Sequence, residues 1–373
     1  MSDDTKTDPD NKTEPDNKTA PDKTDPEPTS EKPETPGIPP RRRTPLIIAA
    51  VAIIAVIAVI AAVVLGGGAD EETATESGDV TEVKIGEVAG AAAKPTTIEV
   101  PVVDEIREKV PQEILDRGTL EIGQGALPAG FPPLAFVGTD NKTLTGAEPD
   151  LSRLIAAVFG LKPELNNATW QNLFVGLDAG TSDVAISNVT DTEERKQKYD
   201  FASYRQDNLG FATVGTSTWE FGGDYRTLDG LKVAVGSGTN QEKILLEWQA
   251  KLKAEGKKLD VKYFPDNPAT WTALESGQID AYFGPNPGIA YQIAGTGDTF
   301  RNAGTFSGAG ESLQGLIAAT TKKDSGLVEA LADAINYLIE NGQYATWLET
   351  YGLSNEAVGK SEINPPGLPL ENQ

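Results

Sequence analysis

The sequence predicts an α/β fold for residues 113 to 355, preceded by a disordered tail and one transmembrane helix. Apolar runs with strand character alternate with segments of helical period through that region, which is the pattern of α/β proteins. The N-terminal residues are almost free of apolar side chains, and a long apolar run follows them. We therefore divide the chain into a tail, a membrane anchor, a stalk and a globular part.

The predicted tail comprises residues 1 to 43. They are mostly Asp, Glu, Lys, Thr, Asn and Pro, with a loose repeat in "DPDNKTEPDNKTAPDKTDPEP". Such a segment buries too little apolar surface to offset the entropy cost of ordering, so we expect it to be disordered. We interpret it as a solubilising tail, with a protein-binding or spacer arm as the alternative.

The predicted anchor is the unbroken apolar run "LIIAAVAIIAVIAVIAAVVL" at residues 46 to 65, which has about the 20 residues that a spanning helix needs. Three arginines precede it and three acidic residues follow it, so the positive-inside rule places the tail in the cytoplasm and the rest outside the cell. A cleaved export signal is the alternative, although its apolar core is typically only about 7 to 15 residues long. We predict an uncleaved, single-pass anchor in the cell membrane.

Two further segments flank the globular part. Residues 69 to 112 are rich in Ala, Glu, Thr and Pro, and we expect a stalk with one strand in "TTIEVPVV" and a short amphipathic piece in "VDEIREKVPQEIL". Residues 356 to 373 are predicted to be a C-terminal tail.

The globular part has the pattern of two βαβ-type units. In the first, residues 151, 154, 155, 158 and 159 are apolar at helical spacing, and Asp150 is placed to cap or flank the start of that helix. In the second, "LDVKYF", "NPATWTALESGQ" and "IDAYFG" follow as strand, helix and strand, with Asn267 and Pro268 expected as N-cap and first helical residue. Ligand groups of such units lie at the carboxyl ends of strands, so we expect a site made by loops.

The composition excludes several functions. The 32 Lys and Arg residues against 56 Asp and Glu residues leave a formal charge of -24, which repels nucleic-acid phosphates. The chain has no Cys and no His, which removes thiolate nucleophiles, imidazole bases and most transition-metal sites. We predict no cofactor, no metal and no nucleic-acid partner. The missing Cys also excludes a lipid-modified N-terminal Cys as a tether.

Five segments carry a resemblance to a known family: "FPPLAFVGTDNKTLTGAEPDLSRLIAAVFGL", "TWQNLFVGLDAGTSDVAISNVTDTEERKQKYDFASY", "LDGLKVAVGSGTNQEKIL", "TWTALESGQIDAYFG" and "ALADAINYLIENGQYATWLETYG". In this order they resemble the bacterial extracellular solute-binding proteins of family 3, the polar amino-acid type that delivers substrates to ABC importers. The resemblance implies a two-lobed periplasmic-binding-protein-like fold of type II with two crossover strands. Lobe one would be residues 113 to 213 plus 312 to 355, and lobe two residues 214 to 311.

The resemblance also implies a carboxylate site at Arg195, which ends the motif S-x-x-T-x-T-x-x-R. Its guanidinium offers two parallel N–H donors to a ligand carboxylate, which a Lys point charge does not. Ser187, Asn188 and Thr190 lie on the preceding turn and are expected to meet the ligand's α-substituents. A surface ion pair with a neighbouring acid is the alternative role for Arg195.

Four more positions match ligand contacts of the family. Gly238 and Asn240 match the helix N-terminus that gives backbone donors to the same carboxylate, an arrangement that suits anions. Phe131 and Trp170 match the aromatic residues that sandwich the ligand side chain. Packing in the core is the alternative for these two aromatic residues.

The sequence departs from the family where an acid normally pairs with the ligand's α-ammonium group. The turn there reads "GPNPG", with Pro285 at the aligned position and Asn286 beside it, and the loop "GQGALPAGF" also has no acid. Either Asn286 and backbone carbonyls suffice, or the ligand has a secondary, quaternary or absent amine. Phe131 and Trp170, with Tyr204 nearby, would suit a quaternary cation through cation–π contact.

These observations predict the substrate-binding component of an ABC importer, which captures a small carboxylate-bearing solute without catalysis. Its partners would be the solute, ABC permease subunits and, through its own helix, the membrane. A membrane-anchored ligand sensor is one alternative. A dehydratase of cyclohexadienyl acids, known on this fold, is another, although the chain has no His and no acid at the "GPNPG" turn for general acid catalysis.

Overall fold

The structure is a computed structural model, and it describes residues 79 to 370. The predicted tail of residues 1 to 43 and the predicted anchor of residues 46 to 65 lie outside the described residues. Between residues 79 and 370, no helix is both long and apolar enough to cross a bilayer.

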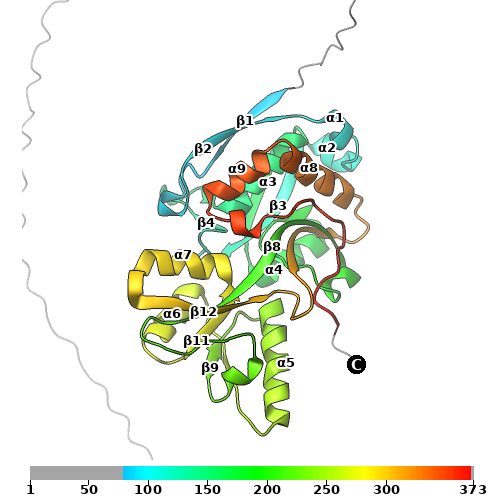
Figure 1. Ribbon diagram of the computed structural model, residues 1–373. Helices are drawn as coiled ribbons and strands as arrows, with labels where there is room; N and C mark the ends of the chain where they lie inside the picture. The colour runs from blue at the N-terminus through cyan, green and yellow to red at the C-terminus, as the bar shows by residue number, and fades with distance from the viewer. Residues whose placement is uncertain (1–78, 371–373) are drawn as a thin grey trace, which may run out of the picture. The chain divides into compact units, whose positions relative to one another are not determined.

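One long strand, β8 (Tyr199–Val214), belongs to both lobes of the molecule (Figure 1). Its first half pairs with β13 (Gly315–Lys322), and its second half pairs with β12 (Phe300–Ser307) and β11 (Ala281–Pro285). The chain therefore leaves lobe one between Asp207 and Asn208 and returns through residues 308 to 314. The predicted two-lobed α/β architecture is confirmed.

We define lobe one as residues 79 to 207 and 315 to 356, and lobe two as residues 208 to 307. The predicted boundary after residue 213 lies too late in the chain. The boundary is hard to locate in the sequence because one continuous strand of 16 residues serves both halves of the sheet, and no turn marks the crossing.

Lobe one is built on the strand order β8-β13-β7-β3-β6, in which β3 runs parallel to β6 and β7. The predicted amphipathic helix is α3, whose residues Leu151, Leu154 and Ile155 are fully buried. It begins at Ala147, so Asp150 lies within the first turn rather than at the cap. Apart from β8 and β13, the strands and α-helices of this lobe from residue 119 on are β3 (Thr119–Leu127), β4 (Phe136–Val137), β5 (Leu144–Thr145), α3 (Ala147–Val158), β6 (Lys162–Thr169), α4 (Trp170–Ala179), β7 (Val184–Ala185), α8 (Val328–Glu340) and α9 (Gln343–Thr350).

Lobe two continues the sheet through β11, β9 and β10, with β12 on the other side of β8. Its core is aromatic: Phe211 stacks on Phe283 with ring centroids 4.3 Å apart, and Trp248 packs beside them. Asp266, not the predicted Asn267, caps α6, because its carboxylate accepts the N–H of Ala269 at 2.8 Å. The remaining elements are β9 (Lys232–Ala234), α5 (Asn240–Ala254), β10 (Asp260–Lys262), α6 (Asn267–Glu275) and α7 (Asn286–Thr296).

The described part of the predicted stalk, residues 79 to 112, is folded into lobe one. Strands β1 (Val80–Ile85) and β2 (Thr96–Pro101) form an antiparallel hairpin, followed by α1 (Asp104–Arg107) and α2 (Gln112–Arg117). Alternate side chains of the hairpin face inward, and Ile85 and Val100 are fully buried in the core of lobe one. The stalk prediction is therefore wrong for these residues, because the short strands alternate apolar and polar residues over only six positions each.

The described part of the predicted C-terminal tail is also packed. Residues 357 to 370 run along β8, where Ile363 forms an antiparallel bridge with Ala202. This segment is named the strap below.

We predict that Ile85→Ala destabilises the protein by about 2 to 5 kcal/mol, because it leaves a cavity between the hairpin and α3. Val80→Ala, in the same strand but with a side chain 57 % exposed, is the matched control and should change the melting temperature little. Thermal and urea unfolding of both variants measure the difference. Equal, small effects would show that the hairpin does not contribute to the core.

Candidate ligand-binding cleft

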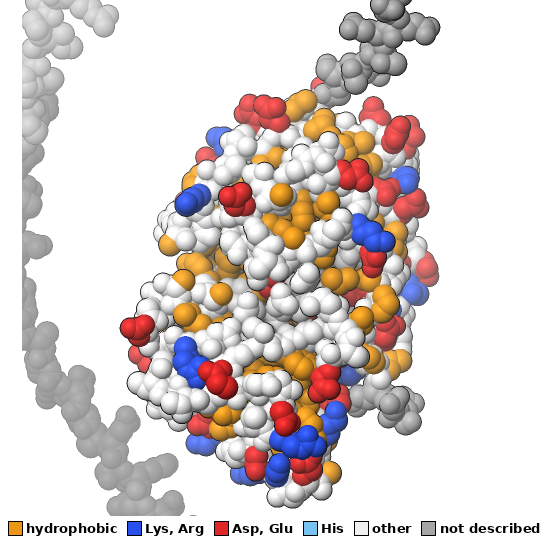
Figure 2. Space-filling model, viewed as in Figure 1, with side chains coloured by type: hydrophobic (Ala, Val, Ile, Leu, Met, Phe, Trp, Pro, Cys, Tyr) orange, Lys and Arg blue, Asp and Glu red, His pale blue; other side chains and the backbone are white. Residues whose placement is uncertain are grey.

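A cleft of about 340 Å³ lies between the two lobes. Lobe one contributes the loop after β3, the start of α4 and the turn after β7; lobe two contributes the start of α5, the loop before α6 and the end of β11. The cleft therefore lies at the carboxyl ends of β3, β7, β9 and β11, as expected for an α/β fold, and its volume suits a small molecule. On the face shown in Figure 2, charged side chains crowd the end of lobe two but are sparse in the band between the lobes.

Five of the predicted site residues line this cleft: Phe131, Trp170, Ser187, Asn188 and Asn240. Arg195 and Gly238 are not among the lining residues, but both contact the lining residue Trp170. Thr190 lies behind the cleft, and Asn286 lies at the start of α7, where its Oδ1 accepts a hydrogen bond from Asn302 at 2.9 Å. The structure thus brings the predicted lobe-one and lobe-two residues together around one space, with Asn286 set apart from it.

The guanidinium of Arg195 is held between aromatic rings and backbone carbonyls. Its carbon lies 5.4 Å from the ring centroids of both Trp170 and Phe174. One amino group donates to the carbonyl of Thr190 at 2.9 Å, and the other crosses to lobe two and donates to the carbonyl of Gly238 at 3.2 Å. Trp170 donates to the same carbonyl at 3.2 Å. Arg195 is therefore positioned at the edge of the cleft and links the two lobes.

Arg195 has no carboxylate partner among residues 79 to 370. The acids close to it in sequence pair elsewhere, Glu193 with Lys196 at 2.8 Å and Glu194 with Lys243 at 3.2 Å. Burial lowers the pKa of Arg195 to about 10, against the attraction of more distant carboxylates. A carboxylate placed on this guanidinium would compensate a charge that carbonyl dipoles compensate only in part.

The start of α5 is capped by its own side chains. Thr239 accepts the N–H of Glu242 at 3.2 Å, and the N–H of Gly238 donates to the carboxylate of Glu242 at 2.6 Å. The N–H of Gly238, predicted to meet a ligand carboxylate, is thus already satisfied in this arrangement. Gln241 in the same turn lines the cleft, and within the described residues its buried Oε1 accepts no hydrogen bond.

Asp207, which the sequence reasoning missed, joins the lobes at the crossover. Its Oδ2 accepts hydrogen bonds at 2.8 Å from the hydroxyl of Thr190 in lobe one and from the amide of Asn240 in lobe two. Burial raises the pKa of Asp207, while these two hydrogen bonds and Arg205 oppose the shift. This carboxylate therefore uses the hydroxyl of Thr190, which was predicted to meet the ligand, and the side-chain amide of Asn240, whose backbone was predicted to do so.

A glycine makes the approach of the return crossing to Asp207 feasible. A Cβ added to Gly308 would lie 1.7 Å from Oδ2 of Asp207, so only glycine fits there. The carbonyl of Gly308 in turn accepts the amide of Asn240 at 3.0 Å. The acid of "YRQDN", inside the long run that forms β8, was the signal available in the sequence.

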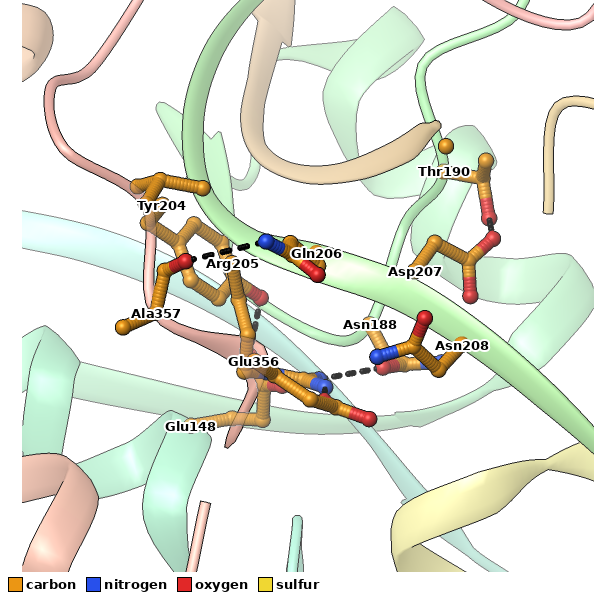
Figure 3. A network of polar contacts seen from close by, with 12 residues as sticks. Glu148, Asn188, Thr190, Tyr204, Arg205, Gln206, Asp207, Asn208, Glu356 and Ala357 are labelled. Carbon is orange, nitrogen blue, oxygen red and sulfur yellow. Dashed lines mark hydrogen bonds and ion pairs between the residues drawn. The ribbon is translucent and has the colours of Figure 1, made fainter. Parts of the chain in front are cut away.

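A second buried network supports the cleft from the lobe-one side (Figure 3). Arg205 pairs with Glu148 at 3.1 Å and with Glu356, and it also donates to Oδ1 of Asn188. Burial alone would lower the pKa of Arg205, but the two carboxylates outweigh it and raise the pKa above its ordinary value. Asn188 has a φ of 51°, a conformation that Asn tolerates better than most residues, so this bond fixes a cleft residue in a left-handed turn.

Among residues 79 to 370, two charged side chains line the cleft, Glu148 and Asp266. Both oxygens of Glu148 are used, one by Arg205 and the other by the hydroxyl of Tyr204. Asp266 uses Oδ1 as the cap of α6, and among residues 79 to 370 no group donates to its Oδ2. The family pattern has its acid at the turn that here reads "GPNPG", whereas the structure has an acid on the neighbouring loop, in "PDNP" at the start of α6.

The fold and the cleft define a two-lobed ligand-binding protein with its site at the ends of parallel strands. Residues 125 to 354 match the sequence model of the bacterial extracellular solute-binding proteins, family 3, and this match spans more than half of the chain. The chain belongs to this family. The hairpin of β1 and β2 and the strap both lie outside the matched residues.

Individual relatives are similar over most of their own length. The chain is 32% identical over 240 residues to the L-cystine-binding protein TcyJ of Escherichia coli strain K12, which covers 62% of this chain and 81% of that protein. It is 29% identical over 269 residues to the arginine-binding protein ArgT of Corynebacterium glutamicum, with 71% and 84% covered. A solved structure of an ancestral arginine-binding protein bound to arginine has a TM-score of 0.54 and 26% identity, and covers 63% of this chain and 98% of that one.

We predict that Arg205→Met destabilises the protein by about 3 to 5 kcal/mol, because it leaves Glu148 and Glu356 buried without a counter-charge. Arg226→Met, which breaks the exposed pair with Glu255 in lobe two, is the control and should leave the melting temperature nearly unchanged. Urea unfolding at neutral pH compares the two variants. A loss for Arg205→Met as small as that of the control would contradict a tightly coupled network.

Proposed function

We propose that this protein is the substrate-binding component of an ABC importer, and that it captures an amino acid or amino-acid-like zwitterion in the interlobe cleft without catalysis. One observation carries the proposal: Arg195, without a carboxylate partner in the described residues, lies at the edge of a cleft whose one incompletely used acid is Asp266. A zwitterion supplies the opposite charge to each. The names of the relatives, which bind cystine and arginine, support the same class of ligand.

The carboxylate of the ligand would bind Arg195. Its two parallel donors are now directed at carbonyl oxygens of Thr190 and Gly238, and a carboxylate is a stronger acceptor than either. The cap of α5 uses the N–H groups of Gly238 and Glu242 but not those of Asn240 and Gln241, two residues that line the lobe-two wall. The ligand would therefore replace the Arg195–Gly238 contact by a charged bridge between the lobes.

The cation of the ligand would bind Asp266, with Phe131 and Trp170 on the lobe-one wall. In this assignment Asp266 supplies the carboxylate that the "GPNPG" turn lacks, so Asn286 need not pair with a full charge. The alternative of a quaternary or secondary amine held by the aromatic rings remains a candidate, because both rings line the same cleft.

A permease would recognise the conformation in which the two lobes are closed around the ligand. Contacts between the lobes already include Trp170 with Gly238 and Lys243 with Glu194 at 3.2 Å. A ligand that touches both walls binds this arrangement better than a splayed one, and that differential affinity shifts the population. We place the domain outside the cell, anchored by residues 46 to 65, with a membrane-anchored sensor as the competing role. Turnover of prephenate would reveal the dehydratase instead.

We predict that Arg195→Ala lowers the affinity for carboxylate ligands by about 2 to 5 kcal/mol, roughly 30-fold to several thousand-fold. Calorimetric titration of the full chain with L-arginine, L-cystine, L-glutamine, glycine betaine and ectoine measures this and identifies the ligand. Arg226→Ala is the control and should bind as the unaltered protein does. Undiminished affinity in Arg195→Ala would overturn the carboxylate assignment.

We predict that Asp266→Asn weakens binding of the preferred amino acid about tenfold or more, while stability stays unchanged, because Asn caps a helix as well as Asp does. The N-acetyl derivative of that amino acid, which lacks the ammonium charge, should bind both proteins equally weakly. If Asp266→Asn leaves the affinity unchanged and betaines bind tightest, the aromatic alternative replaces this one.

A further inference from the structure

The strap, residues 357 to 370, adds a third connection between the lobes. It follows the last element of lobe one and lies along the edge of β8 that faces away from β13, where Ser203 donates to the carbonyl of Glu362 at 3.0 Å and Asn364 to that of Phe201 at 2.9 Å. Figure 1 shows the C-terminal coil descending from lobe one past β8 toward lobe two. The strap thus covers an open strand edge before it leaves lobe one.

Beyond β8, the strap holds the turn that carries Arg195. The N–H of Glu193 donates to the carbonyl of Leu368 at 3.0 Å, and the N–H of Gly367 donates to the carboxylate of Glu193 at 3.0 Å. Lys196 donates to the carbonyl of Pro365. The residues on both sides of Arg195 are therefore bonded to the strap, while the Arg195 side chain points toward the cleft edge.

The end of the strap reaches lobe two. The side chain of Leu368 is only 6 % exposed and belongs to the hydrophobic core of lobe two, in the cluster that contains Leu209 and Phe211. One residue thus bonds the Arg195 turn of lobe one through its backbone and packs in lobe two through its side chain. The strap lies outside the residues that match the family, whereas the residues that it contacts in β8 and in the Arg195 turn lie within them.

The contact between strap and turn is close enough to require glycine. A Cβ on Gly367 would lie 2.4 Å from the carbonyl oxygen of Asp191 and 3.0 Å from its Oδ1. A Cβ on Gly359, in the same strap, would meet nothing within 4 Å. The two glycines therefore form a matched pair, in which one substitution displaces the strap from the turn and the other does not.

We propose that the strap positions Arg195 for the ligand carboxylate and ties its turn to lobe two, so that Gly367 and Leu368 set ligand affinity without touching the ligand. They are positioning residues that act through Arg195. The inference rests on the proposed function for the chemistry of the ligand, whereas the strap's hold on the turn is tested without any ligand.

The first experiment is hydrogen–deuterium exchange of the full chain without added ligand. In Gly367→Ala, the amides of residues 191 to 196 should exchange about tenfold faster, while those of β3 keep their protection. Gly359→Ala should exchange as the unaltered protein does. Unchanged exchange of residues 191 to 196 in Gly367→Ala would overturn the proposal.

The second experiment measures binding of L-arginine, L-cystine and L-argininamide, which lacks the carboxylate. Gly367→Ala should weaken binding of the free acids about tenfold and leave that of the amide unchanged, and it should cost nothing further in an Arg195→Ala background. Equal losses for acid and amide would assign the strap a general structural role and overturn its action through Arg195. If neither amino acid binds the unaltered protein, the proposed ligand class is wrong. Hydrogen–deuterium exchange alone then tests whether the strap holds the Arg195 turn.

A second pair of variants covers the case in which Gly367→Ala does not fold. Leu368→Ala removes the side chain from the lobe-two core, whereas Leu370→Ala removes one that is 50 % exposed. The proposal expects faster exchange of residues 191 to 196 and weaker acid binding in Leu368→Ala alone. Identical behaviour of the two variants would contradict it.

Discussion

The buried carboxylate of Asp207 is the point on which the two-lobed arrangement depends. It lies where β8 passes from one lobe to the other, and it accepts hydrogen bonds from Thr190 on one side and Asn240 on the other. A buried carboxylate without such partners would cost several kcal/mol of desolvation, so lobe one and lobe two are each required to satisfy it. The point where β8 passes between the lobes is therefore also a point where buried hydrogen bonds join them.

Side chains two apart on a strand share a face, and β8 uses this to place charges beside the cleft. Arg205 and Asp207 follow each other on one face, and Arg205 helps to lower the pKa that burial raises in Asp207. Arg205 also holds Asn188 and the two carboxylates of Glu148 and Glu356. These bonds use carboxylate oxygens of Glu148 and Glu356 inside the wall of the cleft, and Arg195 and Asp266 are the charges to which we assign the ligand.

How much of the fold and the site could be predicted from the sequence depends on how far apart along the chain the interacting residues lie. Helix α3 was predictable because its period is local, and the family motif located Phe131 and Trp170 at the cleft. The bond from Thr190 to Asp207 spans 17 positions and the pair of Arg205 and Glu356 spans 151, and no local pattern encodes either. A hydroxyl on a turn therefore predicts a polar contact, but not whether its partner is a ligand or the protein itself.

The two flanking segments, the hairpin and the strap, likewise depend on contacts that are distant in the sequence. The hairpin and the strap each bury apolar residues against a surface made by distant parts of the chain, as Ile85 and Leu368 do. The strap's backbone also satisfies donors on an edge of β8 and on the Arg195 turn. Because Leu368 is anchored in lobe two, any separation of the lobes must strain the strap or pull on the turn. The position of Arg195, to which we assign the ligand carboxylate, and the separation of the lobes are thus mechanically linked, so a ligand held by Arg195 would act on both at once.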